Sequence, residues 1–107
     1  MSVKQIDTLD AMGIDEDGNL VLLIVDDLRW LNIKKHLSYL QDKINSYVSF
    51  IENKQFYETY RDKNINSYVI KIEFLYVIPM RTVRFLDIVN EQLNKYNIYV
   101  KYEENHG

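Results

Sequence analysis

The spacing of apolar residues along the chain predicts a β-hairpin at the start. A loosely alternating segment, residues 5–12, precedes the polar stretch Asp15–Asn19, and a fully apolar run, Leu20–Val25, follows. An Asp-Gly pair between two such runs is a strong turn signal, because glycine accepts the positive φ that tight connections require. Since the second run is apolar on both faces, we place it in the middle of a sheet.

A long amphipathic helix is predicted after this strand. Asp26 and Asp27 can cap its first turn, where short carboxylates accept hydrogen bonds from unpaired amides. Beyond them, apolar positions repeat in steps of three and four for about six turns. This stripe consists of Trp30, Ile33, Leu37, Leu40, Ile44, Tyr47, Val48 and Ile51. The opposite side is polar, so the helix is expected on the surface of the domain.

The second half of the chain predicts a strand, a helix and a final strand. Residues 53–66 have no clean period and predict a loop with a helical turn, whereas residues 68–77 alternate as a strand with one core face. Pro79 suits the first turn of a helix, where its missing amide proton is not needed. Asn97 can stop this helix, because asparagine tolerates the left-handed conformation. Residues 98–102 form the last strand, and a frayed tail follows at about 103–107.

The element order ββαβαβ defines the expected fold. Strand–helix–strand connections run parallel and right-handed, so both helices should lie on one face of a mixed four-stranded sheet. The predicted fold class is α+β, a two-layer sandwich whose other sheet face is half open. Because 107 residues leave room for one hydrophobic core, residues 1–107 are expected to form a single domain.

Charge and cysteine content narrow the class of protein. The net charge of −3 is spread along the chain, whereas nucleic-acid binding needs clustered lysines and arginines. The strongest basic pair, Lys34 and Lys35, is typical of a solvated helix side. The chain has no cysteine, which excludes disulfides and favours a cytoplasmic location. Asp7 and Asp10 interrupt the apolar stretch that a secretion signal needs, and no apolar run is long enough to span a membrane.

Candidate metal ligands have simpler interpretations. Asp15, Asp17 and Asn19 invite a calcium loop, but the glycine comes two residues too early and the closing glutamate is missing. These residues favour a plain hairpin turn. His36, beside Lys35, is expected to be a surface or boundary residue of the helix. We therefore expect no metal and no cofactor.

Catalytic groups do not form a recognisable set either. Asp26 and Asp27 are adjacent at a strand end and should point in different directions, and helix capping accounts for one of them. The three glycines do not form a phosphate-binding loop. The chain is therefore expected not to be an enzyme, and a cryptic active site ranks behind any binding function.

Two sets of residues are candidates for binding. Trp30 is expected chiefly to pack at the edge of the core, with a ligand or partner contact as the alternative. Tyr57, Tyr60 and Arg61 belong to residue types enriched at protein interfaces, although a loop packed on its own domain would use them as well.

A third set depends on the predicted sheet. Lys71 and Glu73 should share the open sheet face with Tyr99 and Lys101. If one side of the sheet is uncovered, these side chains can meet a protein partner or a second copy of the chain, so a homodimer is possible.

Parts of the chain resemble a known family. The resemblance is carried by Asp-Gly-Asn before an apolar strand that ends at Asp26-Asp27, by Trp30, and by His36-Leu37-x-x-Leu40-Gln41-x-Lys43-Ile44-Asn45-x-Tyr47, with similar pieces through Phe50-Ile51-Glu52. It is a family of small bacterial proteins catalogued only as a domain of unknown function. The resemblance therefore assigns no activity and no catalytic residue.

Two hypotheses of function follow. The first is a protein-binding module of accessory or immunity type, because an acidic inhibitor is electrostatically suited to a basic partner. The alternative is a small-ligand-binding or regulatory domain, as a monomer or a dimer, with a cleft at the strand ends near Trp30 and the loop before Asn66.

Overall fold

The computed structural model describes residues 3–4, 9–61 and 64–104. Within them, the strands are β1 (Ala11–Ile14), β2 (Leu20–Asp26), β3 (Tyr68–Phe74) and β4 (Ile98–Glu104). The helices are α1 (Ile33–Glu52) and α2 (Met80–Leu93), with short 3-10 helices η1 (Gln55–Glu58) and η2 (Asn94–Tyr96).

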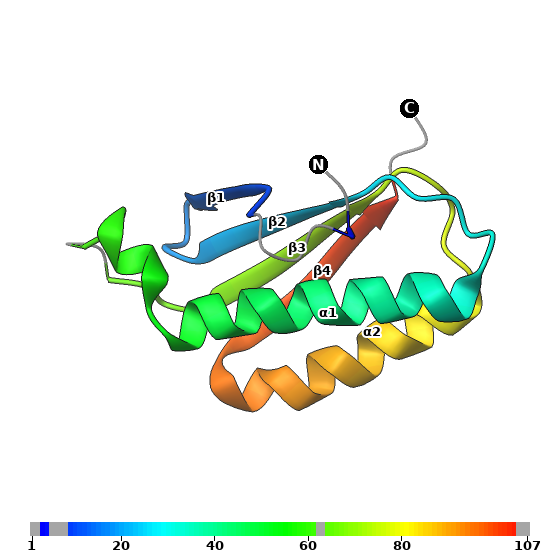
Figure 1. Cartoon of the computed structure of the whole chain (residues 1–107). Coiled ribbons are helices and arrows are strands. Elements are labelled where there is room, and N and C mark those ends of the chain that lie inside the picture. The colour runs from blue at the N-terminus through cyan, green and yellow to red at the C-terminus, as the bar shows by residue number, and fades with distance from the viewer. Residues whose placement is uncertain (1–2, 5–8, 62–63, 105–107) are drawn as a thin grey trace.

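The strands form one mixed sheet in the order β1-β2-β3-β4. β1 pairs antiparallel with β2, whereas β2, β3 and β4 are parallel. Helices α1 and α2 lie side by side on the same face of this sheet (Figure 1), as two right-handed crossovers in one direction require. The predicted α+β two-layer sandwich is confirmed.

The hydrophobic core lies between the sheet and the two helices. Side chains of β2 alternate between buried and partly buried, and those of β3 follow the same period over most of their length. Burying one such apolar side chain stabilises the fold by about 1.5–3 kcal/mol. The fully buried centre includes Leu22, Ile24, Leu40, Ile44, Ile70, Ile72, Phe74 and Leu86.

The predicted start of α1 is wrong. The helix begins at Ile33, and Asn32 caps it by accepting a hydrogen bond from the Lys35 amide at 3.1 Å. Asp26 instead belongs to the end of β2, and its carboxylate accepts from the Leu28 amide at 3.2 Å. This local turn competes with helix formation. Trp30 therefore lies in the β2–α1 connection and not in a first helical turn.

Other boundaries shift by smaller amounts. β1 is Ala11–Ile14, closer to the turn than predicted, while residues 5–8 of the predicted strand lie outside the described residues. β3 ends at Phe74, and Pro79 is the N-cap of α2. Asn97 has the expected left-handed backbone, with φ of 65°.

The predicted tail is partly ordered as strand. Glu103 and Glu104 belong to β4, and the Glu104 carboxylate accepts a hydrogen bond from the Ile78 amide at 3.0 Å. Residues 105–107 lie outside the described residues. The contact joins the end of β4 to the loop that leads into α2.

Candidate functional site

The carboxyl end of β2 carries a buried acid–histidine pair. Nε2 of His36 lies 2.6 and 2.8 Å from the two carboxylate oxygens of Asp26. The two residues are 3% and 1% exposed. Because an ionised carboxylate can only accept, Nε2 carries the proton of this bond. The pair joins the last residue of β2 to the first turn of α1.

This arrangement leaves the second ring nitrogen of His36 unused. Nδ1 is buried and has no hydrogen-bond partner among the described residues. Buried polar atoms are almost always paired, so an unpaired one needs an explanation. With Nε2 protonated, Nδ1 of a neutral ring offers a lone pair, and Nδ1 of a charged ring offers a proton.

Trp30 fixes the orientation of the imidazole. Its indole stacks on the His36 ring with centroids 3.5 Å apart and planes 13° apart, and it packs against Phe74 at 6.0 Å. Nε1 of Trp30 is also buried without a hydrogen-bond partner within the described part of the chain. Since the ring is held by Asp26 at one edge and by indole on one face, it has little freedom to rotate.

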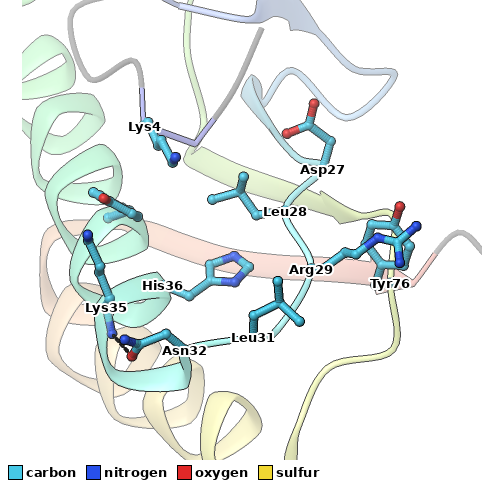
Figure 2. A pocket seen from close by; sticks show the side chains of 10 residues that line it. Lys4, Asp27, Leu28, Arg29, Leu31, Asn32, Lys35, His36 and Tyr76 are labelled. Carbon is cyan, nitrogen blue, oxygen red and sulfur yellow. Dashed lines mark hydrogen bonds between the residues drawn. The ribbon is translucent and has the colours of Figure 1, made fainter.

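His36 is one wall of an open cleft of about 430 Å³. The cleft lies between the β2–α1 connection, the first two turns of α1 and the loop after β3. Figure 2 shows the His36 ring extending from α1 into the space between Leu28 and Leu31. The other lining residues among those described are Lys4, Asp27, Arg29, Asn32, Lys35, Tyr39 and Tyr76.

The cleft is basic although the protein is acidic overall. Arg29, Lys35 and Lys4 line it against one exposed carboxylate, that of Asp27, while the whole chain carries a net charge of −3. Aromatic rings position the cations. The Arg29 guanidinium lies 5.3 Å from the centroid of the Tyr76 ring.

Lys4 and Lys35 approach a second ring, that of Tyr39, at 5.5 and 6.0 Å. In Figure 2 these lysines and Arg29 lie on opposite sides of His36. A negatively charged group between them would meet a cation from either side.

The helix terminus adds to the same field. The first turn of α1 contains no acidic residue, and Asn32 and Lys35 of this end line the cleft. The amino end of a helix carries a partial positive charge that favours anions. The arrangement can therefore bind a carboxylate or phosphate, and the ring of His36 offers a hydrogen bond to such a group.

The prediction that His36 is a surface or boundary residue is wrong, because its side chain is buried, and it missed the central residue of the site. His36 precedes Leu40 by four residues, so it shares the buried stripe of α1. Lys43 continues this stripe and is 0% exposed, with Nζ 3.5 Å from Oδ1 of Asp10. A histidine and a lysine at i and i+7 beside an apolar stripe were the available signal.

The structure places Trp30 behind the cleft and not in its lining. The loop before Asn66 lies elsewhere, because the Asn66 amide donates to the Gly18 carbonyl at 3.0 Å, at the opposite end of the sheet. The cleft at the carboxyl ends of the strands is therefore separate from that loop.

The other candidate residues occupy two further places. Tyr57, in η1, is 44% exposed. Tyr60 and Arg61 follow η1 at the far end of α1 from the cleft. Lys71 and Glu73 lie on β3. Their side chains point away from the helices, so the structure does not join the two groups into one surface.

The described residues contain neither a cluster of metal ligands nor a membrane-spanning helix. Within residues 3–4, 9–61 and 64–104, no three His, Cys, Asp or Glu side chains gather in a way that could hold a metal ion. In the same residues, no helix has the length and apolar character needed to cross a membrane.

Comparison with known proteins identifies the family. A family model described as a family of unknown function, DUF6572, matches residues 1–106, so the chain belongs to this family. Searches of curated proteins and of solved structures found no match.

Proposed function

We propose that this member of the family is a small-ligand-binding domain whose cleft takes an anionic metabolite with a carboxylate or phosphate group. One observation carries the proposal: His36, which lines a basic cleft, is almost fully buried, is held on Asp26, and keeps a buried Nδ1 without a partner among the described residues. A ligand oxygen that bonds Nδ1 would complete its hydrogen bonding. The same oxygen would lie within the field of Arg29 and Lys35.

The position of the cleft supports this proposal. In open α/β sheets, ligands bind outside the carboxyl ends of the strands. Here the carboxyl end of β2 supplies Asp26, and the connection that follows supplies Arg29 and Asn32. A planar guanidinium is suited to a carboxylate or phosphate because it can donate two parallel hydrogen bonds.

Trp30 provides the readout for a direct test. It is the one tryptophan of the chain and it stacks on His36, so occupation of the cleft should change its fluorescence. The probes are inorganic phosphate, pyrophosphate, citrate and AMP, each added up to about 10 mM, which detects even millimolar affinity. We expect saturable binding of at least one probe, accompanied by a shift of the His36 ring resonances in NMR spectra.

Two neighbouring lysines give a matched control. Lys35 lines the cleft, whereas Lys34 is an exposed residue of the same helical turn that does not line it. Lys35→Gln should weaken binding about tenfold, the usual cost of losing a charged hydrogen bond, and Lys34→Gln should leave it unchanged. Equal effects of both substitutions, or no saturable response to any probe, would contradict the proposal.

A protein partner is a second candidate function, and exposed apolar side chains favour it. Leu31, Val77 and Met80 are 89%, 63% and 66% exposed, and they belong to the two connections beside the cleft and to the start of α2. Clustered exposed apolar residues commonly mark protein contacts. This end of the molecule, rather than Tyr57, would then meet the partner of an accessory or immunity-type protein.

The two candidates separate by substitution. Val77→Ser with Met80→Ser should abolish capture of a stoichiometric protein partner while leaving anion binding intact, because neither residue lines the cleft. Lys35→Gln should weaken anion binding and leave capture of the protein partner unchanged. If the double serine variant captures the same partner in the same amount, the apolar end is not the contact.

A further inference from the structure

The sheet face opposite to the helices has an apolar half and a charged half. Ala11, Val21, Leu23 and Val25 lie on the β1–β2 half, because their partners in the register share one face. A hollow of about 390 Å³ follows this half and reaches Lys71 and Glu73 of β3. Such a half-apolar face is suited to another protein surface.

The charged half has two rows of side chains that run across the strands, a lysine level and a glutamate level, two residues apart along each strand. Lys71 lies directly opposite Lys101, and Glu73 lies directly opposite Glu103. Like charges directly opposite each other on neighbouring strands destabilise a sheet. One diagonal ion pair, between Nζ of Lys71 and Oε1 of Glu103 at 3.4 Å, offsets this little, because its side chains are 35% and 64% exposed.

We propose that this face packs on the same face of a second copy of the chain. The two-fold axis would lie in the interface and run across the strands, between the lysine level and the glutamate level. This axis brings the apolar half of one copy onto the apolar half of the other. It also brings Lys71 and Lys101 of one copy opposite Glu73 and Glu103 of the other.

The charge pattern excludes the other in-plane axis. A two-fold axis along the strands would place the β1–β2 half of one copy on the charged β3–β4 half of the other. Paired sheets pack about 10 Å apart with their strands nearly aligned, and a closed two-fold contact uses the same patch twice. The dimer does not rest on the proposed ligand, because Arg29, Asn32 and Lys35 of the cleft do not belong to this face.

Charge reversal tests the geometry. Lys71→Glu with Lys101→Glu makes all four positions acidic, and Glu73→Lys with Glu103→Lys makes them all basic. Light scattering on the eluting peak and sedimentation should show a wild-type dimer and, for each variant alone, a dissociation constant raised at least about 100-fold. An equimolar mixture of the two variants should recover the mass of a dimer.

A control variant changes the net charge as much as Lys71→Glu with Lys101→Glu does, but at positions outside the sheet face. Lys34→Glu with Lys95→Glu reverses two exposed lysines away from the face, and it should leave the dimer intact. A monomeric wild type at about 200 µM would overturn the proposal, since specific contacts of this kind are detectable at that concentration. A wild-type dimer that both reversals leave unchanged would overturn it as well.

A measurement on the wild type covers the case in which a variant fails to fold. Carbodiimide joins lysines to carboxylates in contact, and a mixture of ¹⁴N- and ¹⁵N-labelled protein marks links between copies. We expect mixed-isotope peptides that join Lys71 to Glu73 and Lys101 to Glu103, the pairs that this axis places opposite each other. Peptides of one isotope alone would mean that the face does not meet a second copy.

Discussion

The two ends of the parallel strands are both rich in polar side chains, but only one end satisfies them internally within the described residues. At the amino end, Oδ1 of Asp15 accepts from the amides of Asp17 and Asn19 at 3.0 and 2.9 Å. Ser67 donates to the Asn19 side chain at 2.7 Å. Asn97 donates to the Asn66 carbonyl at 2.6 Å, closing the network across the strands.

At the carboxyl end, Asp26 and His36 are paired but incomplete. Nδ1 of His36 and Nε1 of Trp30 have no partners among the described residues, and basic side chains converge beside them. At the amino end, the polar side chains hydrogen-bond to the turns and to one another, so these hydrogen bonds serve the fold. The carboxyl end keeps unused hydrogen-bonding capacity beside a cleft, which is the capacity that our proposal assigns to a ligand.

The largest expected effect is at the carboxyl end. Asp26→Ala removes the acceptor of both His36 and the Leu28 amide in the protein interior. Breaking such a buried pair should lower the free energy of unfolding by about 3 kcal/mol. Urea denaturation measures this change.

The adjacent carboxylate provides the control for that experiment. Asp27 is exposed, so Asp27→Ala should change the stability by less than about 0.5 kcal/mol. A similar loss in both variants would mean that the Asp26–His36 pair has no special structural role.

An intermediate effect is expected in the turn at the amino end. Gly18 has φ of +80°, and a Cβ there would lie 2.8 Å from Nδ2 of Asn66. Gly18→Ala should therefore cost about 2 kcal/mol from strain and from loss of the Asn66 contact. Thermal unfolding followed by circular dichroism measures it.

Gly13 is the matched glycine. A Cβ at Gly13 would meet nothing within 4 Å, so Gly13→Ala should be neutral or slightly stabilising. If Gly18→Ala proved as harmless as Gly13→Ala, the turn would not require its glycine.

The smallest expected effect is a pH dependence at Asp15. Hydrogen bonds from the amide of Asn19 hold the pKa of this carboxyl below its usual value of 3.8. A lowered folded pKa stabilises the protein above the unfolded pKa, and this contribution is lost as the pH falls through the folded pKa. Wild type should therefore exceed Asp15→Asn in stability at about pH 7, with the gap narrowing below pH 3.8.

The measurement compares the urea unfolding of both proteins at several pH values, because other carboxylates cancel in the difference. A gap that stays constant down to about pH 2.5 would show that the charge of Asp15 does not contribute to stability.

The sequence was sufficient for the element order and for a mixed four-stranded sheet with both helices on one face, but the strand order within the sheet was not predicted. The period of α1, the apolar run of β2 and the glycine of the turn each have a local cause, so the pattern reveals them. The start of α1 was missed because Asn32, and not Asp26, caps the helix. Asp26 resembles a cap in the sequence, but its carboxylate is directed to His36 ten residues later.

The site could be predicted only in part, for the same reason. Trp30 was expected chiefly to pack at the edge of the core; in the structure it packs there and stacks against His36, but it does not line the cleft. That stacking contact depends on the path of residues 27–32, a connection without the regular spacing of apolar residues that reveals helices and strands. Arg29 and Lys35 look like ordinary surface cations until this connection brings them together.

The strand order has a consequence for biosynthesis. Because β1, β2, β3 and β4 neighbour one another in the order of the chain, each strand can join the sheet as it leaves the ribosome. Until residues 98–104 emerge, β3 is the edge of the sheet, and the side chains that Ile98 and Val100 later cover remain accessible. An unpaired apolar edge is a template for wrong pairing, so we expect the nascent protein to be most vulnerable to misassembly after β3 has emerged and before β4 has.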